Sequence, residues 1–101
     1  MTRLEFMVSA QRALLGFITP NVRSVTGSLG EQSVVVRYIV HGEIDEPTRE
    51  ELSSASTQII ADMHHDWAFE EEFMRLDAPT PLRGATLPIH FYERYEPLPP
   101  E

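Results

Sequence analysis

The sequence predicts one small α+β domain with the element order α-β-β-α-β-β: an antiparallel sheet of about four strands with two helices packed on one face. Its 101 residues suffice for one ordinary domain but not for two. Hydrophobic residues make up 42% of the chain, which is enough for one core without a disulfide or metal. Segments of helical spacing alternate with strand-like segments, as an α+β domain requires. We expect the domain to span residues 1–96 and the tail, residues 97–101, to be extended.

The first helix is predicted over residues 3–18. Its apolar residues recur at near-helical spacing and are expected to face the core: Leu4, Met7, Val8, Leu14, Leu15 and Ile18. Gly16 weakens the last turn, and Thr19 precedes Pro20, a position that disfavours helical backbone. The helix should therefore end before residue 19.

Two strands are predicted next, over residues 22–28 and 33–40, joined by a hairpin turn. Gly27 and Gly30 are expected to supply the positive backbone angles that such a turn needs. The second strand carries apolar residues on both faces, which is typical of a central strand. With both helices on one face, the other face of the sheet is expected to be partly open to solvent or to a partner.

The second helix is predicted to begin after Asp45, whose side chain can cap the first turn. Glu46 and Pro47 are both favourable in a first helical turn. An apolar stripe with the spacing i, i+3, i+4, i+7 follows: Leu52, Ala55, Ile59, Ile60 and Met63. The remaining two strands are expected over residues 67–76 and 89–96, with a proline-rich connection between them.

Charge is the strongest compositional signal. The chain has no lysine, eight arginines and sixteen acidic residues, so its net charge is −8. Residues 41–101 contain four of those arginines but fourteen of the acids. A negative chain is repelled by phosphate, which argues against nucleic acid or an anionic membrane as a partner. The charge favours a basic protein partner, or serves only to keep the domain soluble.

The sequence offers no thiol chemistry and no cofactor motif. Cysteine is absent, as expected for a chain in the reducing cytoplasm. Glu5 interrupts the N-terminal apolar residues, so no secretion signal is expected there. No run of about 18 apolar residues marks a membrane span. No glycine elbow or phosphate-binding loop is present, and we predict that the protein is not an enzyme.

His64, His65 and Asp66 are the one candidate metal or catalytic cluster. If they continue the second helix, consecutive side chains point about 100° apart, so the two histidines cannot both face one ion. Histidines at a helix C-terminus also interact favourably with the helix dipole. We therefore predict no metal site, and a small ligand-binding or metal-dependent enzyme domain using these residues stays an alternative.

Glu70, Glu71 and Glu72 form a run of acids within a predicted strand that also carries aromatic residues. Strand alternation places Glu71 on one face and the other two glutamates on the opposite face. Such charges either protect an exposed strand from pairing with other chains or form part of an interface. Catalysis by paired carboxylates would need an apolar pocket and a cleft, which the pattern does not indicate.

Four short segments give the chain a resemblance to a known class of protein. They are residues 12–16 (RALLG), 19–23 (TPNVR), 41–44 (HGEI) and 59–62 (IIAD). With these motifs the chain resembles small bacterial immunity proteins of contact-dependent growth inhibition and related toxin systems. The resemblance implies a cytoplasmic protein that binds and neutralises one cognate toxin domain, often a basic nuclease. It supplies no catalytic residues to transfer.

The resulting hypothesis is an inhibitor that binds a basic toxin through an acidic surface containing aromatic residues. The predicted partner-binding residues stand in the C-terminal half: Asp62, Asp66, Glu70, Glu72, Tyr92 and Glu93. The hypothesis requires these side chains to lie together on one exposed patch. The alternative is a homo-oligomer, in the simplest case a homodimer, that associates through the open sheet face.

Overall fold

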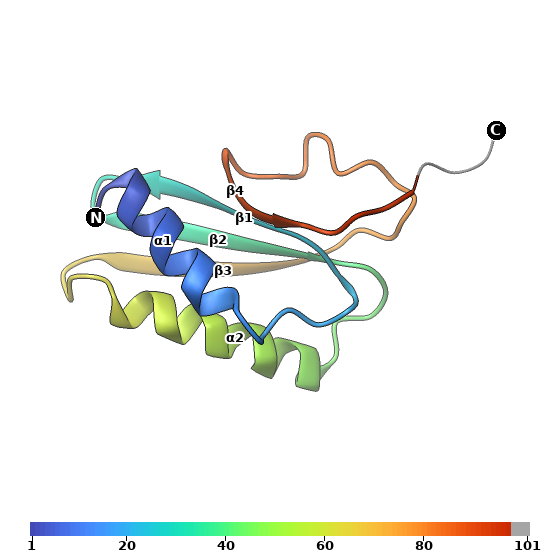
Figure 1. Cartoon of the computed structure of the whole chain (residues 1–101), viewed down its shortest axis with the longest axis horizontal. Helices are drawn as coiled ribbons and strands as arrows, with labels where there is room; N and C mark the ends of the chain where they lie inside the picture. Colours follow the sequence, from blue (N-terminus) through green and yellow to red (C-terminus); the bar gives the residue numbers. More distant parts are fainter. Residues whose placement is uncertain (98–101) are drawn as a thin grey trace.

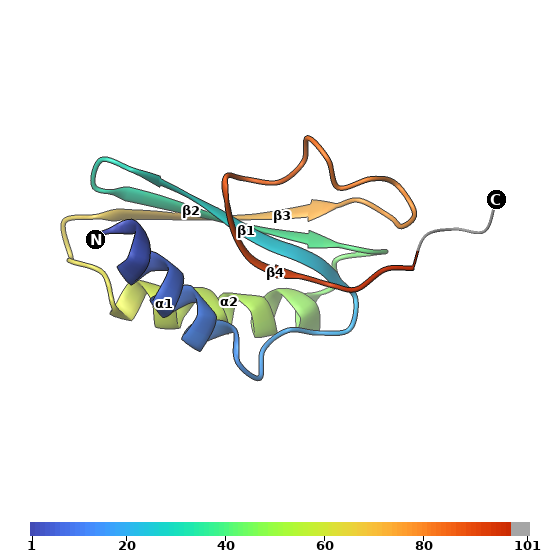
Figure 2. The same ribbon diagram turned by 45° about the horizontal axis from the view of Figure 1, so that its top comes forward.

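The computed structural model describes residues 1–97, so the predicted tail beyond Pro97 lies outside the described residues. The elements follow the predicted order α-β-β-α-β-β (Figure 1). They are α1 (Arg3–Leu14), β1 (Val22–Gly30), β2 (Ser33–Val40), α2 (Glu46–Ala61), β3 (Ala68–Arg75) and β4 (Ile89–Glu93). Both helices lie on the same face of the sheet, as predicted (Figure 2).

The sheet has the strand order β3-β2-β1-β4, and it is mixed. β1 runs antiparallel to β2 and β4, but β2 and β3 are parallel. The prediction of an antiparallel sheet is therefore wrong for this one pair. The reason is that α2 carries the chain back along the sheet, so that Ala68 of β3 pairs with Ser33, the first residue of β2. The central position predicted for β2 is confirmed.

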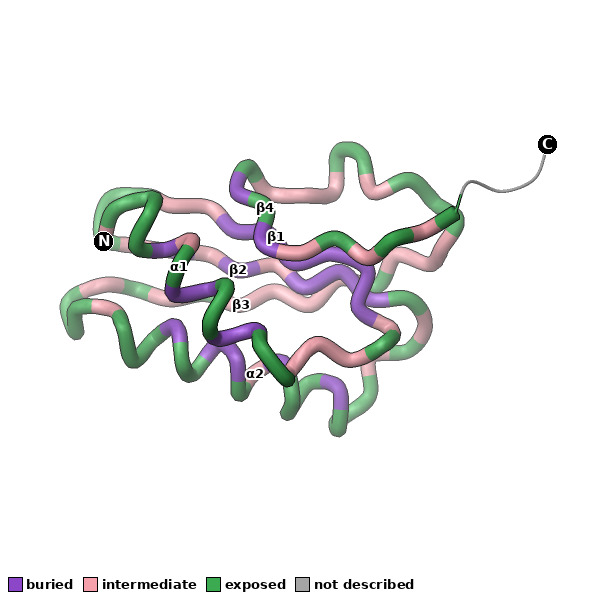
Figure 3. The backbone as a smooth tube through the Cα atoms, in the orientation of Figure 1, coloured by how far each residue is buried: buried purple, intermediate pink, exposed green. Residues whose placement is uncertain are grey.

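The core lies between the helices and the inner sheet face, where β1 and β2 are largely buried (Figure 3). Two aromatic pairs pack in this core, one between α1 and the sheet and one between two neighbouring strands. Phe6 of α1 meets Phe91 of β4 edge-on at 5.0 Å between ring centroids, and Tyr38 of β2 stacks on Phe73 of β3 at 5.4 Å. The buried hydroxyl of Tyr38 bonds Ser56 of α2 at 2.8 Å. Burial raises the pKa of Tyr38 to about 12.

α2 begins as predicted, because the Asp45 side chain accepts a hydrogen bond from the backbone N–H of Thr48 at 3.0 Å. Two residues of its predicted stripe are not core residues, since Ile60 is 47% exposed and Met63 lies beyond the helix end. Its buried stripe is Thr48, Leu52, Ala55, Ser56 and Ile59. The helix ends at Ala61, before the histidines.

α1 buries only part of the predicted stripe, since Leu14 is in the core and Met7 and Ile18 pack against it. Its buried residues are Phe6, Ser9, Ala10, Ala13 and Leu14, whereas Leu4, Val8 and Leu15 are 71%, 48% and 75% exposed. The small residues of this stripe allow the helix to approach the sheet closely. Close packing therefore determines which face of α1 is buried, and hydrophobicity alone does not. The helix also ends at Leu14, earlier than predicted, because Gly16 adopts a positive φ of 85°.

The β1–β2 turn consists of Glu31 and Gln32, and Gln32 has a φ of 54°. The glycines expected to form the turn belong to β1 instead. Gly27 has a packing role, because a Cβ atom there would lie 2.7 Å from the ring of Phe91 and 2.8 Å from that of Phe6. Its missing side chain makes room for the aromatic pair.

The sheet face opposite the helices, which was expected to be partly open, is partly covered by the chain itself. After β3, at one edge of the sheet, residues 76–88 cross that face to reach β4 at the other edge (Figure 2). Arg37 donates to the carbonyl of Ala85 at 2.6 Å, and the backbone N–H of Leu87 donates to Thr26 at 2.9 Å. Ile39, on the covered face, is fully buried.

Arg23 holds residues 76–88 against the sheet, and only 2% of its side chain is exposed. Its guanidinium donates to the carbonyls of Leu76 and Thr80 at 2.7 and 2.8 Å. It also binds both carboxylate oxygens of Glu96, each at 2.8 Å. Hydrogen bonding to Arg23 lowers the pKa of Glu96 from 4.5 to about 2.

Replacement of Gly27 by alanine should destabilise the protein by about 1–3 kcal/mol, because the new methyl group collides with two buried rings. Urea unfolding at neutral pH measures the change. Ser28→Ala, one residue along the same strand, is the control and should change stability by less than about 0.5 kcal/mol. Equal stability of Gly27→Ala and wild type would contradict the packing role.

Stability should fall as the pH falls from about 4.5 towards 2. A carboxyl whose folded pKa lies below its unfolded value stabilises the protein above the unfolded pKa, and this stabilisation disappears as the group is protonated in the folded state. Glu96→Gln should flatten the curve of unfolding free energy against pH in this window. Glu93→Gln, at an exposed neighbour on β4 that makes no ion pair within residues 1–97, is the control for the loss of one carboxyl. An unaltered slope in Glu96→Gln would refute the assignment.

Candidate interaction surfaces

The six predicted partner-binding residues do not form one patch. Asp62 and Asp66 lie after α2, at the end where β3 starts, and Glu70 and Glu72 lie on β3. Tyr92 and Glu93 belong to β4, at the opposite edge of the sheet. The requirement of a single patch is therefore not met, because the sheet order separates strands that follow one another in sequence.

Several acids of the C-terminal half are paired with the protein's own arginines. Glu72 accepts a hydrogen bond from Arg37 at 3.0 Å, and Asp62 lies 3.6 Å from Arg12. Asp62 also accepts from Ser9 at 2.7 Å. Tyr92 is half-buried, with its ring against the core rather than free as an interface anchor. Glu70 and Glu93 are exposed and make no ion pair within residues 1–97.

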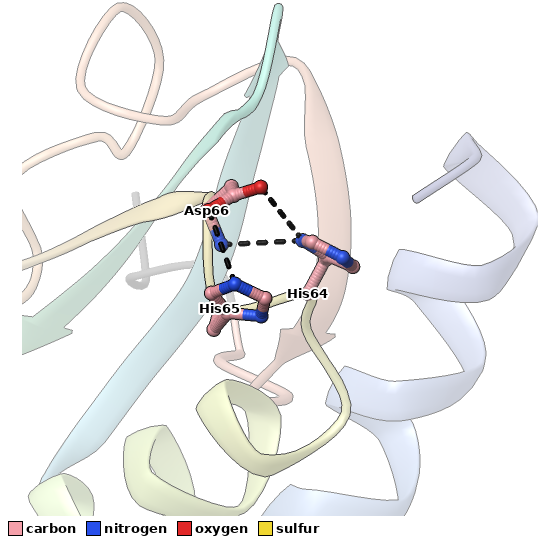
Figure 4. Close-up of side chains that lie close together, drawn as sticks. All are labelled: His64, His65 and Asp66. Carbon is pink, nitrogen blue, oxygen red and sulfur yellow. Dashed lines mark hydrogen bonds and ion pairs between the residues drawn. The ribbon is translucent and has the colours of Figure 1, made fainter.

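His64, His65 and Asp66 are brought together, which the sequence argument did not foresee (Figure 4). Since α2 ends at Ala61, the helical spacing used against a shared site does not apply. The imidazoles stack with centroids 4.4 Å apart and lie 3.5 and 3.2 Å from the Asp66 carboxylate. The Nδ1 atom of His64 already accepts a hydrogen bond from the Asp66 backbone N–H at 3.2 Å. All three are exposed on a turn, so pairing among themselves explains the cluster without a metal.

The β4 edge of the sheet is poorly suited to further strand pairing. β4 has five residues, its register with β1 shifts once, and Pro88 and Pro97 flank it closely. The carbonyl of Phe91 already accepts a hydrogen bond from Gln11 of α1 at 2.9 Å. Short length, irregular register and a covering side chain are features that prevent added strands.

Within residues 1–97, the β3 edge has none of these features. β3 is eight residues long, contains no proline and keeps one register with β2 throughout. The N–H of Ala68 donates to the carbonyl of Gln32, just before β2, at 2.9 Å, and the N–H of Leu76 donates to the carbonyl of Val40 in β2 at 3.0 Å. Strand alternation then directs the backbone groups of the odd-numbered residues away from β2: Phe69, Glu71, Phe73 and Arg75. β3 therefore presents a row of donors and acceptors that have no partner strand within residues 1–97.

α2 lies beside this edge on the helical face and forms with it a surface that we call the α2–β3 flank. The flank consists of Arg49, Ser53 and Ile60 of α2 and Phe69, Glu71 and Phe73 of β3. The Arg49 guanidinium lies 4.9 Å from the centre of the Phe73 ring, and Ser53 donates to Glu71 at 2.9 Å. The second carboxylate oxygen of Glu71 is shielded from water and has no partner within residues 1–97. No residue of β3 is fully buried (Figure 3).

A second candidate surface lies along α1, beside the C-terminal end of α2. Met1, Leu4 and Val8 form the apolar wall of a groove with a volume of about 360 Å³, and Arg12 with Asp62 lines its polar end. The spacing of Leu4 and Val8 was visible in the sequence, but it was interpreted as a core stripe. Exposed apolar residues grouped in this way are typical of interaction sites.

Comparison with known families decides which class of protein carries these surfaces. A family model described as MafI2 immunity protein matches residues 3–96. The chain belongs to the MafI2 immunity protein family. No curated protein matches the chain.

Membership in the MafI2 immunity family confirms the resemblance to bacterial immunity proteins of toxin systems. The family supports an immunity function, a cognate toxin as partner and a role other than catalysis. No helix within residues 1–97 is long and apolar enough to cross a membrane. The surfaces of this MafI2 protein are therefore to be judged as places where a toxin can bind.

Sequence reasoning missed that three residues of α2 belong to the α2–β3 flank: Arg49, Ser53 and Ile60. The glutamate run and its aromatic neighbours were recognised, but the adjacency of Arg49 and Ile60 to β3 depends on how α2 crosses the sheet. No local pattern in the MafI2 sequence predicts how α2 crosses the sheet.

Proposed function

We propose that this protein neutralises a basic, nuclease-like toxin domain in the bacterial cytoplasm by binding it and covering its active surface. The observation that carries the proposal is the family match over residues 3–96. A binding inhibitor needs no catalytic group, and its affinity comes from complementary shape and charge.

Charge supports a basic partner. The protein has a net charge of −8, whereas an enzyme that acts on nucleic acid needs a positive surface to hold phosphates. An acidic inhibitor approaches such a surface faster than a neutral one, because long-range attraction steers the encounter.

The β3 region is the best-supported position for contact with the toxin. Glu70 is exposed and free of ion pairs within residues 1–97, and Glu72 lies beside it on the same face. Asp62 and Asp66 lie at the end of the molecule where β3 starts. A toxin aligned along β3 can therefore contact four of the six predicted residues, while the role predicted for Tyr92 and Glu93 would require a contact at the opposite edge.

The double variant Asp66→Asn with Glu70→Gln should slow association with the toxin domain encoded beside this chain by about tenfold at low salt, because both charges favour encounter. The difference should shrink at high salt as the charges are screened. Surface-based kinetic binding at two ionic strengths measures both rates, and survival of cells expressing the toxin reports protection.

Glu93→Gln is the control for position, since it removes one exposed charge from the opposite edge of the sheet. It should change the association rate less than twofold. A larger effect from Glu93→Gln would move the contact to β4, and a wild-type protein that neither binds nor protects would refute the proposed function.

The groove along α1 favours a second role, self-association through Met1, Leu4 and Val8. In that case light scattering after size exclusion should show a dimer, and Leu4→Glu should convert it to a monomer. Glu50→Gln, on the exposed side of α2, is a control that should leave the mass unchanged. A wild-type monomer at high concentration would exclude this role.

A further inference from the structure

The two edges of the sheet differ in a way that the fold does not require. The β4 edge is short, irregular and partly covered by Gln11, whereas β3 offers eight regular residues. Charge is the only protective feature on the β3 edge within the described residues. Charge excludes some added strands and attracts others, so the β3 edge is selective rather than closed.

Pairing of β3 with a second copy is disfavoured. A two-fold contact between equivalent strands places the same short segment of each chain side by side. For β3 this brings Glu70, Glu71 and Glu72 of one copy against the same glutamates of the other. Like charges opposite one another destabilise a strand pair, so the edge opposes self-association.

For a basic extended segment, the charges of β3 are attractive instead of repulsive. Glu70 and Glu72 project on one side of β3 and Glu71 on the other, so arginine or lysine at successive positions of an added strand finds a carboxylate on either side. The half-exposed Phe69 and Phe73 and the exposed Ile60 add apolar contact on the helical side. The unpartnered oxygen of Glu71 lies within this same flank.

We infer that the toxin contributes an extended basic segment that pairs with the free edge of β3 as a fifth strand of the four-stranded sheet. This inference rests on the proposed function and specifies how the toxin is held. The backbone groups of Phe69, Glu71, Phe73 and Arg75 provide the hydrogen bonds, and the glutamates select a cationic segment.

Glu71→Pro tests the pairing. Proline removes an N–H that faces away from β2, so the sheet keeps its own hydrogen bonds, but an added strand loses a donor and meets the ring. Glu71→Ala is the matched control, because it removes the same carboxylate and keeps the N–H. We expect Glu71→Pro to bind the toxin domain encoded beside this chain about 100-fold more weakly than wild type, and Glu71→Ala about threefold to tenfold more weakly.

Folding of each variant is checked by circular dichroism and thermal unfolding. If Glu71→Pro does not fold, Arg75→Pro replaces it, since its N–H also faces the free edge and its side chain is exposed. Its matched control is Arg75→Ala. A proline variant that folds and binds within threefold of its alanine control overturns the strand pairing while leaving the proposed function intact. Absence of toxin binding by the wild-type protein overturns both.

Discussion

The packing of α2 across the inner face of the sheet determines the remainder of the fold. Asp45 caps its start, and Leu52, Ala55 and Ile59 are fully buried along its length. Because this helix returns the chain to the start of β2, the next strand must run parallel to β2. β1 already occupies the other side of β2, so β3 takes the outer position. The exposed edge of β3 is thus a consequence of how α2 packs.

The position of β3 has a second consequence on the opposite face. The chain must travel from one edge of the sheet to the other before β4 can form, and the crossing segment covers apolar residues such as Ile39. Arg23 and Arg37 hold this segment and in doing so neutralise Glu96 and Glu72. Because these arginines pair with acids of the same chain, the negative charge that stays unpaired is confined to a few positions. One of these positions is on β3.

The sequence was sufficient where structure depends on neighbouring residues. The cap at Asp45 and the central strand that contains Tyr38 follow from local chemistry and alternation. It was insufficient where the structure depends on contacts between residues that are far apart in the sequence. The partners of Arg23 stand 53, 57 and 73 residues away, and nothing around position 23 signals them. Leu4 and Val8 were assigned to the core because hydrophobicity alone does not reveal that Ser9 and Ala10 permit closer packing.

The same distinction applies to the interaction surface. The glutamate run of β3 was visible, but whether it lies on a free edge depends on the strand order. Hydrogen exchange of individual backbone amides, with and without bound toxin domain, tests the account most directly. The amides of Phe69, Glu71 and Phe73 should exchange rapidly in the free protein and slowly in the complex, while the even-numbered amides of β3 should be slow in both. Unchanged rapid exchange at these three amides in a complex that protects another surface would contradict it.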